Sequence, residues 1–412
     1  MPNKNSSFMP MAIIGLLFFV FGFVTWLNGS LIPFLKIICE LNDFEALFVT
    51  FAFYIAYTVM ALPMSFILER VGYKNAMALG LTIMVVGSLL FIPAAMSANY
   101  LIFLIALFVL GTGLTILQTA SNPYIVLIGS KESAAMRISI MGLINKGAGV
   151  IVPLIFTALI LSDIGTIDGS ASAEQLNTLA SRLIEPYVYM ALTLSALVVL
   201  VKFSPLPELE FTQDKNLDQH TSIFKYPQAI LGSIALFFYV GVEVIAADTI
   251  GLFGQSLAVE NFTSLTSYTM VFMVIGYILG VLLIPKYISQ EKALLSSAIA
   301  GILITIAIVL SSNTDTLILN TPNSIMLVAL LGLANALVWP TIWPLALDGL
   351  GKQTARASAL LIMAIAGGAI LPLVFGKLAE VSGDFQQAYL VLIPSYLFIL
   401  FYAIKGHKLK SW

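Results

Sequence analysis

Long apolar stretches alternate with short polar segments along almost the whole chain of 412 residues. A helix of roughly 20 residues crosses a hydrocarbon core about 30 Å thick, and each stretch is long enough to do so. The pattern predicts an all-α membrane protein with twelve spans. They lie near residues 10–38, 44–68, 75–97, 100–129, 138–162, 186–203, 226–257, 263–285, 293–311, 324–348, 354–378 and 386–404.

Composition excludes an ordinary soluble domain. Hydrophobic residues make up 59% of the chain and charged residues 10%, as is typical of integral membrane proteins. The first apolar stretch shows no small-residue cleavage pattern, so we expect a retained helix and not a signal peptide. The formal net charge of -2 gives no sign of a nucleic-acid partner, and we expect none.

Few residues are suited to catalysis or metal binding. Cys39 is the single cysteine, so no disulfide or cysteine-based metal site can form within the chain. His220 lies in a predicted loop and His407 in the tail. The loops are too short for a soluble catalytic domain, and no nucleotide-binding motif is present. We therefore expect no enzyme activity, no cofactor and no transport driven by ATP.

Lysine and arginine residues indicate the orientation of the spans. With the N-terminus inside, three of the 19 basic residues fall outside, Lys36, Arg182 and Lys377, and Lys146 falls within a span. The other basic residues then lie on the cytoplasmic side, as the positive-inside rule requires. We expect both termini in the cytoplasm and a multi-pass location in a cell membrane.

Charge and spacing divide the chain into two halves. Residues 204–225 hold the largest predicted cytoplasmic cluster of charge, and we interpret them as a linker between six-helix bundles at 1–203 and 226–412.

The two halves echo each other in the spacing of arginine and proline. Arg137 lies sixteen residues before Pro153, and Arg356 lies at the same spacing before Pro372. Internal repeats of this size are typical of transporters built from two related bundles, with a site between them near the bilayer midplane.

The loop after the second predicted span carries a known motif. Its sequence is Glu69-Arg70-Val71-Gly72-Tyr73-Lys74. It resembles the cytoplasmic loop signature of the major facilitator superfamily, D-R-x-G-R-K, with Glu in place of Asp and Tyr in place of Arg. The resemblance implies the major facilitator fold of twelve helices in two bundles.

Longer stretches of the chain narrow this resemblance. In the first half they are Phe44-Glu45-Ala46, Phe51-Ala52-Phe53-Tyr54, Ala61-Leu62-Pro63 and Gln118-Thr119-Ala120-Ser121-Asn122-Pro123-Tyr124. These look like the fucose:proton symporter family, which includes bacterial glucose/galactose transporters. In the second half, Tyr239-Val240-Gly241-Val242-Glu243 and Trp339-Pro340-Thr341-Ile342-Trp343-Pro344 look like its glucose/mannose-type members. The resemblance implies alternating access, cation-coupled uptake of a hexose across a bacterial inner membrane, and a monomer.

Two positions depart from that family. In the fucose symporter an Asp follows an Asn of the first span, and a Glu precedes the T-A-x-N-P stretch of the fourth, and both serve proton coupling. This chain has Gly29 after Asn28, and Gln118 before Thr119. Coupling must therefore use other residues or be absent.

Amide side chains within the spans are candidates for contact with a sugar. Gln118 and Asn122 are four residues apart and share one helix face. A buried amide without a partner costs roughly 1–3 kcal/mol, and sugar hydroxyls are suitable partners. The alternative is hydrogen bonding between helices. Asn28, Asn145 and, more weakly, Trp26 complete this set, since an Asn at the place of Asn145 contacts sugar in the family.

A polar and aromatic stripe is predicted on the tenth span. Asn335, Trp339 and Trp343 recur every four residues. Tryptophan is enriched at membrane interfaces, so a Trp at mid-membrane is less expected there. We interpret Trp339 as a surface for stacking of a pyranose. Trp343 lies nearer the cytoplasm and has the alternative role of an interface anchor.

Two acids in the seventh span are candidates for cation coupling. Glu243 lies four residues after Tyr239, which is a further sugar-site candidate, and shares its helix face. Asp248 points roughly 140° away from Glu243 and lies nearer the outer end, where a wetted helix mouth is the alternative. We expect Glu243 to face the central cavity. A proton on this carboxylate or a sodium ion near either acid would serve coupling, and the sequence leaves both open.

Lys146 is a buried charge that the family resemblance does not explain. It lies about 12 Å of helix into the fifth span. Its side chain either snorkels to the cytoplasmic interface, lines the cavity, or pairs with a carboxylate such as Glu243, which would make it part of the coupling group.

Charges at the cytoplasmic side are candidates for gating. Glu69, Arg70 and Lys74 lie between the second and third spans, and Arg137 and Arg356 occupy equivalent repeat positions. In the superfamily such groups close the inner side by ion pairs. The alternative is that they anchor the spans as ordinary positive-inside residues.

We therefore expect a secondary transporter that imports a hexose of the glucose, mannose or galactose type with H⁺ or Na⁺, in contact with the lipid bilayer. The alternative is facilitative or exchange movement of a sugar or another small polar solute, including efflux.

Overall fold

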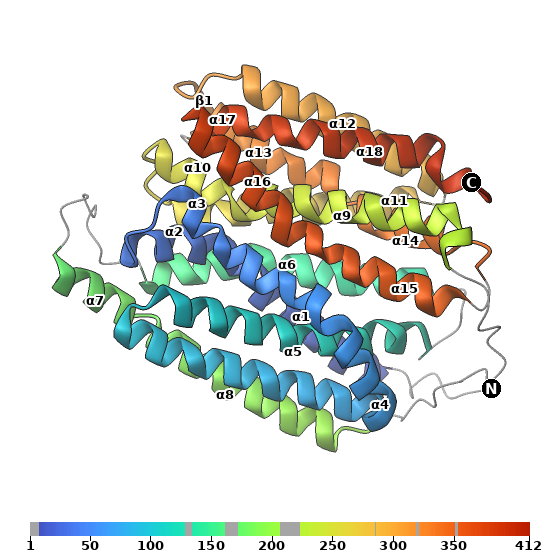
Figure 1. Ribbon diagram of the computed structural model, residues 1–412, viewed down its shortest axis with the longest axis horizontal. Helices are drawn as coiled ribbons and strands as arrows, with labels where there is room; N and C mark the ends of the chain where they lie inside the picture. Colours follow the sequence, from blue (N-terminus) through green and yellow to red (C-terminus); the bar gives the residue numbers. More distant parts are fainter. Residues whose placement is uncertain are drawn as a thin grey trace. The chain divides into compact units, whose positions relative to one another are not determined.

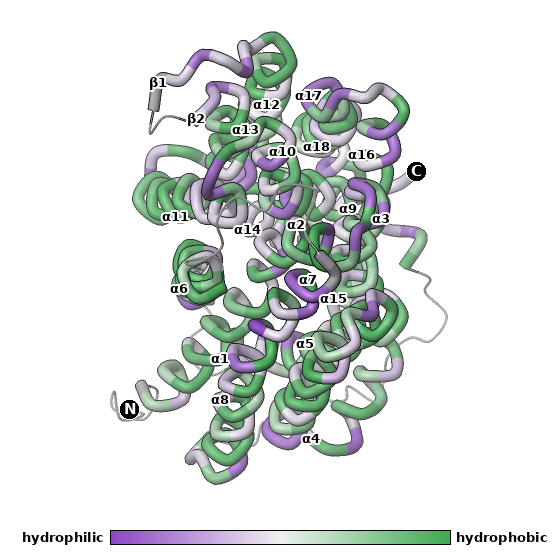
Figure 2. Tube along the Cα trace, turned by 90° about the vertical axis from the view of Figure 1, so that its left-hand side faces the viewer, coloured by the Kyte–Doolittle hydropathy of each residue, from purple (hydrophilic) through white to green (hydrophobic). Residues whose placement is uncertain are grey.

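The described part of the chain is almost entirely helical. Figure 1 shows the computed structural model, which describes residues 8–127, 134–160, 172–206, 223–284, 286–318, 321–350 and 353–412. Within these ranges twelve helical stretches are long and apolar enough to cross a membrane, and hydrophobic residues predominate along them (Figure 2). Each overlaps one predicted span, so the predicted all-α membrane fold is confirmed.

The chain forms two compact units, Met1–Phe211 and Thr212–Trp412. The division falls inside the predicted linker 204–225, of which residues 207–222 lie outside the described part. The bounds of the linker and the side of the membrane on which each terminus lies stay predictions.

Unit 1, Met1–Phe211, is built from long helices. α4 packs against α5 and α8, and α1 packs against α6. The helices are α1 (Phe8–Trp26), α2 (Asn28–Ile38), α3 (Asp43–Ala46), α4 (Phe48–Ser97), α5 (Tyr100–Leu127), α6 (Ala134–Ile160), α7 (Ala173–Ser181) and α8 (Ile184–Phe203). α7 precedes the sixth predicted span, which the sequence pattern began at residue 186.

α4 contains two spans, and the turn between them lies at the predicted loop motif. Gly72 has φ 80° and ψ 168°, a non-helical conformation that divides α4 at this point. A side chain at positive φ would be strained, so this position of the motif suits glycine.

Unit 2, Thr212–Trp412, has α9 at its centre, packed against α13, α14, α16 and α18. A short antiparallel hairpin joins α12 to α13. The elements are the 3₁₀ helix η2 (Ile223–Lys225), α9 (Pro227–Asp248), α10 (Ile250–Ser256), η3 (Phe262–Ser264), α11 (Leu265–Leu283), α12 (Gln290–Leu310), β1 (Thr316–Ile318), β2 (Thr321–Pro322), α13 (Asn323–Asn335), α14 (Val338–Leu347), α15 (Thr354–Met363), η5 (Ala364–Ala366), α16 (Gly367–Ser382), α17 (Phe385–Ala388), η6 (Tyr389–Val391), α18 (Leu392–Ile404) and η7 (Gly406–Lys408).

Three of the interrupted spans have a predicted site residue at the break. Asn28 begins α2 directly after the break from α1, Asp248 ends α9, and Asn335 ends α13. Broken helices expose main-chain groups that continuous helices satisfy internally, and in membranes they occur where a cavity or protein surrounds them. The breaks therefore place these three polar side chains at irregular points of the two units.

Candidate functional site

In unit 1, α1 and α6 meet at a glycine beside a predicted sugar contact. A side chain at Gly22 would collide with the main-chain carbonyl of Asn145, so the glycine permits the helices to approach at this level. One turn further along α1, the Trp26 indole Nε1 donates a 3.2 Å hydrogen bond to Oδ1 of Asn145. Nδ2 of Asn145 donates to the Phe18 carbonyl at 3.4 Å. The amide is therefore held from two sides.

Lys146 joins the same group. Its ammonium lies 4.0 Å from the centroid of the Trp26 ring, within the range of a cation–π interaction. Lys146 is 7% exposed and Trp26 is 2% exposed. The charge thus ends in the interior over an aromatic ring, which argues against snorkelling to the interface. Trp26, Asn145 and Lys146 are called the Trp26 cluster below.

Asn28 lies in unit 1 at the break in the first span. Its side chain is 1% exposed, and Nδ2 has no hydrogen-bond partner among the described residues. An unmet buried donor is costly, so this N–H is available for a ligand group or a water.

Gln118 and Asn122 lie on α5, both partly exposed. Nε2 of Gln118 donates a 3.0 Å hydrogen bond to the Tyr57 hydroxyl of α4. One of the two interpretations of Gln118 was hydrogen bonding between helices. This bond shows that one N–H of its amide serves that purpose. The other interpretation, contact with a sugar, stays a prediction for both residues.

In unit 2, a helix break divides the polar and aromatic stripe predicted on the tenth span. Asn335 ends α13, whereas Trp339 and Trp343 lie on α14. The Trp339 ring on α14 lies 5.6 Å from the Trp343 ring and 6.2 Å from the Tyr239 ring of α9, between ring centroids. Both tryptophans are partly exposed. Nε1 of Trp343 is buried without a hydrogen-bond partner in the described part of the chain.

Glu243 lies among tyrosines from three helices. The Tyr239 hydroxyl lies beside the Glu243 carboxylate, as their common helix face predicts. Tyr277 of α11 and Tyr396 of α18 lie near the same carboxylate. Tyr396 in turn donates to Oδ1 of Asn335 at 2.8 Å. We call Glu243, Tyr239, Tyr277, Tyr396 and Asn335 the Glu243 network.

Asp248 is fully buried at the break between α9 and α10, which argues against a wetted helix mouth. The neighbouring Thr249 hydroxyl donates to the Ile245 carbonyl at 2.6 Å and lies 3.2 Å from the Tyr389 hydroxyl. On the α11 side, Thr266 and Thr269 donate to the carbonyls of Ala247 and Ala246. Hydroxyl groups thus secure the main chain where the helix is interrupted.

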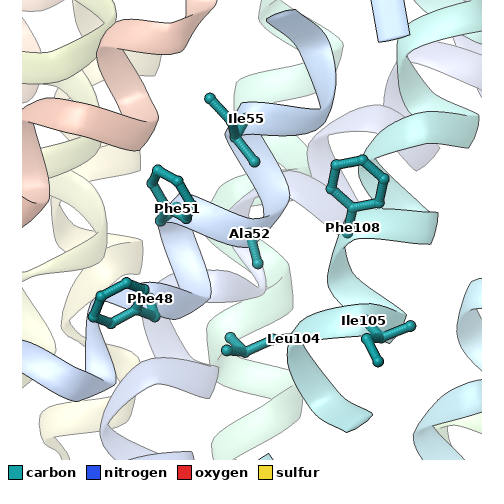
Figure 3. A pocket seen from close by; sticks show the side chains of 7 residues that line it. All are labelled: Phe48, Phe51, Ala52, Ile55, Leu104, Ile105 and Phe108. Atoms are coloured by element: carbon teal, nitrogen blue, oxygen red, sulfur yellow. The ribbon is translucent and has the colours of Figure 1, made fainter. Parts of the chain in front are cut away.

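One hollow of unit 1 is unsuited to a sugar. It has a volume of about 290 Å³ and lies between α4 and α5. Figure 3 shows its seven lining side chains, all apolar: Phe48, Phe51, Ala52, Ile55, Leu104, Ile105 and Phe108. Since a hexose needs hydrogen-bond partners for its hydroxyls, the polar groups described above are the better candidates.

Comparison with known proteins decides the family. Residues 14–372 match the Major Facilitator Superfamily. The chain belongs to this superfamily. Its members are transporters, so the expectation that the chain is not an enzyme is confirmed along with the resemblance noted in the sequence.

Relatives with assigned names span nearly the whole chain. The glucose/galactose transporter of Brucella abortus is 33% identical over 98% of this chain and 96% of its own length. The L-fucose-proton symporter of Escherichia coli is 26% identical over 97% of this chain and 93% of its own length. A crystal structure of the E. coli fucose:proton symporter covers 99% of this chain and 100% of that chain, with TM-score 0.75 and 23% identity, and shares the fold.

The residues predicted to act as a cytoplasmic gate differ in their burial and in their hydrogen-bond partners. Lys74 donates to the Ser204 carbonyl at 2.7 Å, and Nε of Arg137 donates to the Ile125 carbonyl at 2.9 Å. Arg70 and Arg356 are exposed, and the side chain of Glu69 lies outside the described part. Their role in gating stays a prediction.

Sequence reasoning missed the tyrosines. Tyr57, Tyr277 and Tyr396 contact or surround predicted site residues from other helices. A tyrosine hydroxyl buried in an apolar span needs a hydrogen-bond partner, and this signal would have marked all three.

Proposed function

We propose that the chain imports a hexose of the glucose, mannose or galactose type together with H⁺ or Na⁺ by alternating access. The names of the Brucella and E. coli relatives support the substrate class and the coupling. We place the protein in a bacterial inner membrane, surrounded by lipid and acting as a monomer.

The observation that carries the proposal is that Tyr239 lies close both to the Glu243 carboxylate and to the Trp339 ring. Glu243 supplies a carboxylate that a proton or cation can neutralise, and Trp339 supplies an apolar face for the sugar ring. Tyr239 contacts both groups. A change of charge on Glu243 can therefore alter sugar binding at Trp339 through the single side chain of Tyr239. Coupling requires that sugar affinity depend on the charge of Glu243 in this way.

Uptake of labelled hexose into proteoliposomes tests this proposal. Proton and sodium gradients are imposed separately, and unloaded liposomes serve as the control. We expect accumulation above equilibrium under one of the gradients. Absence of uptake for every hexose would overturn the proposal.

Facilitative or exchange transport is the second candidate function. Gly29 and Gln118 favour it, because the related symporters keep carboxylates at these places. Its signature is hexose equilibration that neither gradient drives beyond equal concentrations.

A further inference from the structure

We infer that Lys146 is a positioning residue of the sugar site, which acts through Trp26 on the amide of Asn145. The inference rests on the proposed function, since it concerns how the same site holds a hexose. In this role Lys146 keeps its positive charge and holds Trp26 and Asn145 in place. It does not bind or release the coupled ion.

The first step is the position of the ammonium. Lys146 and Trp26 are both buried, and the ammonium lies 4.0 Å from the ring centroid. Tryptophan offers the best aromatic face for a cation, and the attraction strengthens when water is excluded. The aromatic face of Trp26 is therefore the part of α1 that interacts with the Lys146 ammonium.

The second step is the orientation of the amide. The oxygen and nitrogen of an asparagine side chain exchange places when it flips, so its direction depends on its neighbours. The indole N–H can only donate, so the atom of Asn145 that meets it must be Oδ1. The Phe18 carbonyl can only accept, and it meets Nδ2. Both contacts therefore favour the same orientation of the Asn145 amide.

The third step is what this leaves for the substrate. An amide has two N–H groups and two oxygen lone pairs, and Asn145 uses one of each within unit 1. The remaining N–H and lone pair form an adjacent donor and acceptor. Neighbouring hydroxyls of a pyranose match this pair, because each hydroxyl both donates and accepts. If Trp26 turned away, Asn145 would lose its fixed direction, and the pair would no longer be preorganised.

The fourth step separates this role from ion coupling. A positioning lysine must keep its charge, and arginine, which is always charged and also binds aromatic faces, can replace it. A lysine that carried the coupled proton could not be replaced in this way.

The test compares Lys146→Met, Lys146→Arg and Trp26→Phe with the wild type in hexose binding and proteoliposome uptake. Lys36→Met is the matched control, since Lys36 pairs with Asp43 at the end of α2. We expect Lys146→Met to raise the Kd and KM for hexose about tenfold while Vmax changes less than about threefold. Lys146→Arg should restore affinity, gradient-driven accumulation and the pH profile of uptake. Trp26→Phe keeps a ring but loses the N–H donor, so its KM should also rise.

The outcomes are distinguishable. If the wild type binds and transports no hexose, the proposed function fails and this inference with it. If the wild type transports hexose but Lys146→Met keeps its KM, the inference alone is overturned. If Lys146→Met does not fold, an unchanged KM in Trp26→Phe overturns it. Loss of accumulation in Lys146→Arg with unchanged binding would assign Lys146 to coupling and also overturn it.

Discussion

The Tyr396 hydroxyl donates a 2.8 Å hydrogen bond to Oδ1 of Asn335, which ties α18 to the end of α13. Asn335 is fully buried, and its Nδ2 has no hydrogen-bond partner in the part of the chain that the structure describes. Folded proteins rarely leave a buried donor unmet. The tyrosine therefore fixes the oxygen of this amide, and we predict that its nitrogen donates to a sugar hydroxyl.

Replacing Asn335 should weaken sugar binding. We expect Asn335→Ala to lower hexose affinity about tenfold or more, since a buried polar interaction is worth roughly 1–3 kcal/mol. Tyr396→Phe removes only the anchor of the amide and should cost less, about threefold. Equilibrium binding of labelled glucose measures both. Tyr287→Phe is the control, because Tyr287 is 68% exposed. Equal affinity in Asn335→Ala and the wild type would contradict the assignment.

Trp339 should act through its aromatic face. Trp339→Phe keeps a smaller face and should lose less than fivefold in hexose affinity, whereas Trp339→Ala should lose about tenfold or more. Trp343→Ala, one turn nearer the helix end, should have the smaller effect. If Trp343→Ala weakens binding more than Trp339→Ala in the same assay, the stacking surface has been placed on the wrong ring.

Gln118 and Tyr57 can be separated by paired variants. If Gln118 contacts sugar, Gln118→Ala lowers hexose affinity about threefold to tenfold, whereas Tyr57→Phe lowers only protein stability, by about 1 kcal/mol. If Gln118 serves helix packing, both variants lower stability alike and leave affinity unchanged. Binding and thermal unfolding measurements on the two variants decide between these results.

The low reactivity of Cys39, the single cysteine of the chain, permits a test of membrane orientation with an introduced cysteine. Burial raises the pKa of its thiol to about 12, and Sγ donates to the Ala98 carbonyl at 3.6 Å. The thiolate is the reactive form, and it forms only as pH rises toward that pKa. At pH 8 its population is therefore on the order of a thousandfold below that of a thiol with pKa 9.

We therefore expect the wild type to react slowly with maleimides at pH 8. Ser411→Cys, in the exposed tail, should react in intact cells with a membrane-permeable reagent and be protected from an impermeable one. Labelling by the impermeable reagent would place the C-terminus outside and reverse the predicted orientation.

The spans were predictable because their signal is local. Twenty apolar residues report a membrane helix wherever they occur, and the predicted stretches match the helices within a few residues, apart from the early start at α7. Gly72 was also visible, since the loop motif requires a turn there. The breaks beside Asn28, Asp248 and Asn335 were not, because a single polar residue in an apolar span also occurs in continuous membrane helices.

The contacts of the site were harder to predict. Glu243 and Tyr239 share a helix face, so their proximity follows from spacing. Tyr396 reaches Asn335 across 61 positions, and Trp26 reaches Asn145 across 119. Such contacts depend on how helices pack, which a single apolar pattern does not specify. Lys146 was recognised as a buried charge, but its aromatic neighbour lies on α1, so spacing within α6 does not reveal it.

Glu243→Gln tests the central claim most directly, because it removes the charge and keeps the size of the side chain. Two measurements are made in the same proteoliposomes: accumulation of labelled hexose under the driving gradient, and exchange of labelled for unlabelled hexose without one. Asp248→Asn is the parallel variant for the second acid of the span. The account predicts that Glu243→Gln abolishes accumulation and retains exchange. Unchanged accumulation in Glu243→Gln, together with its loss in Asp248→Asn, would contradict the account and place coupling at Asp248.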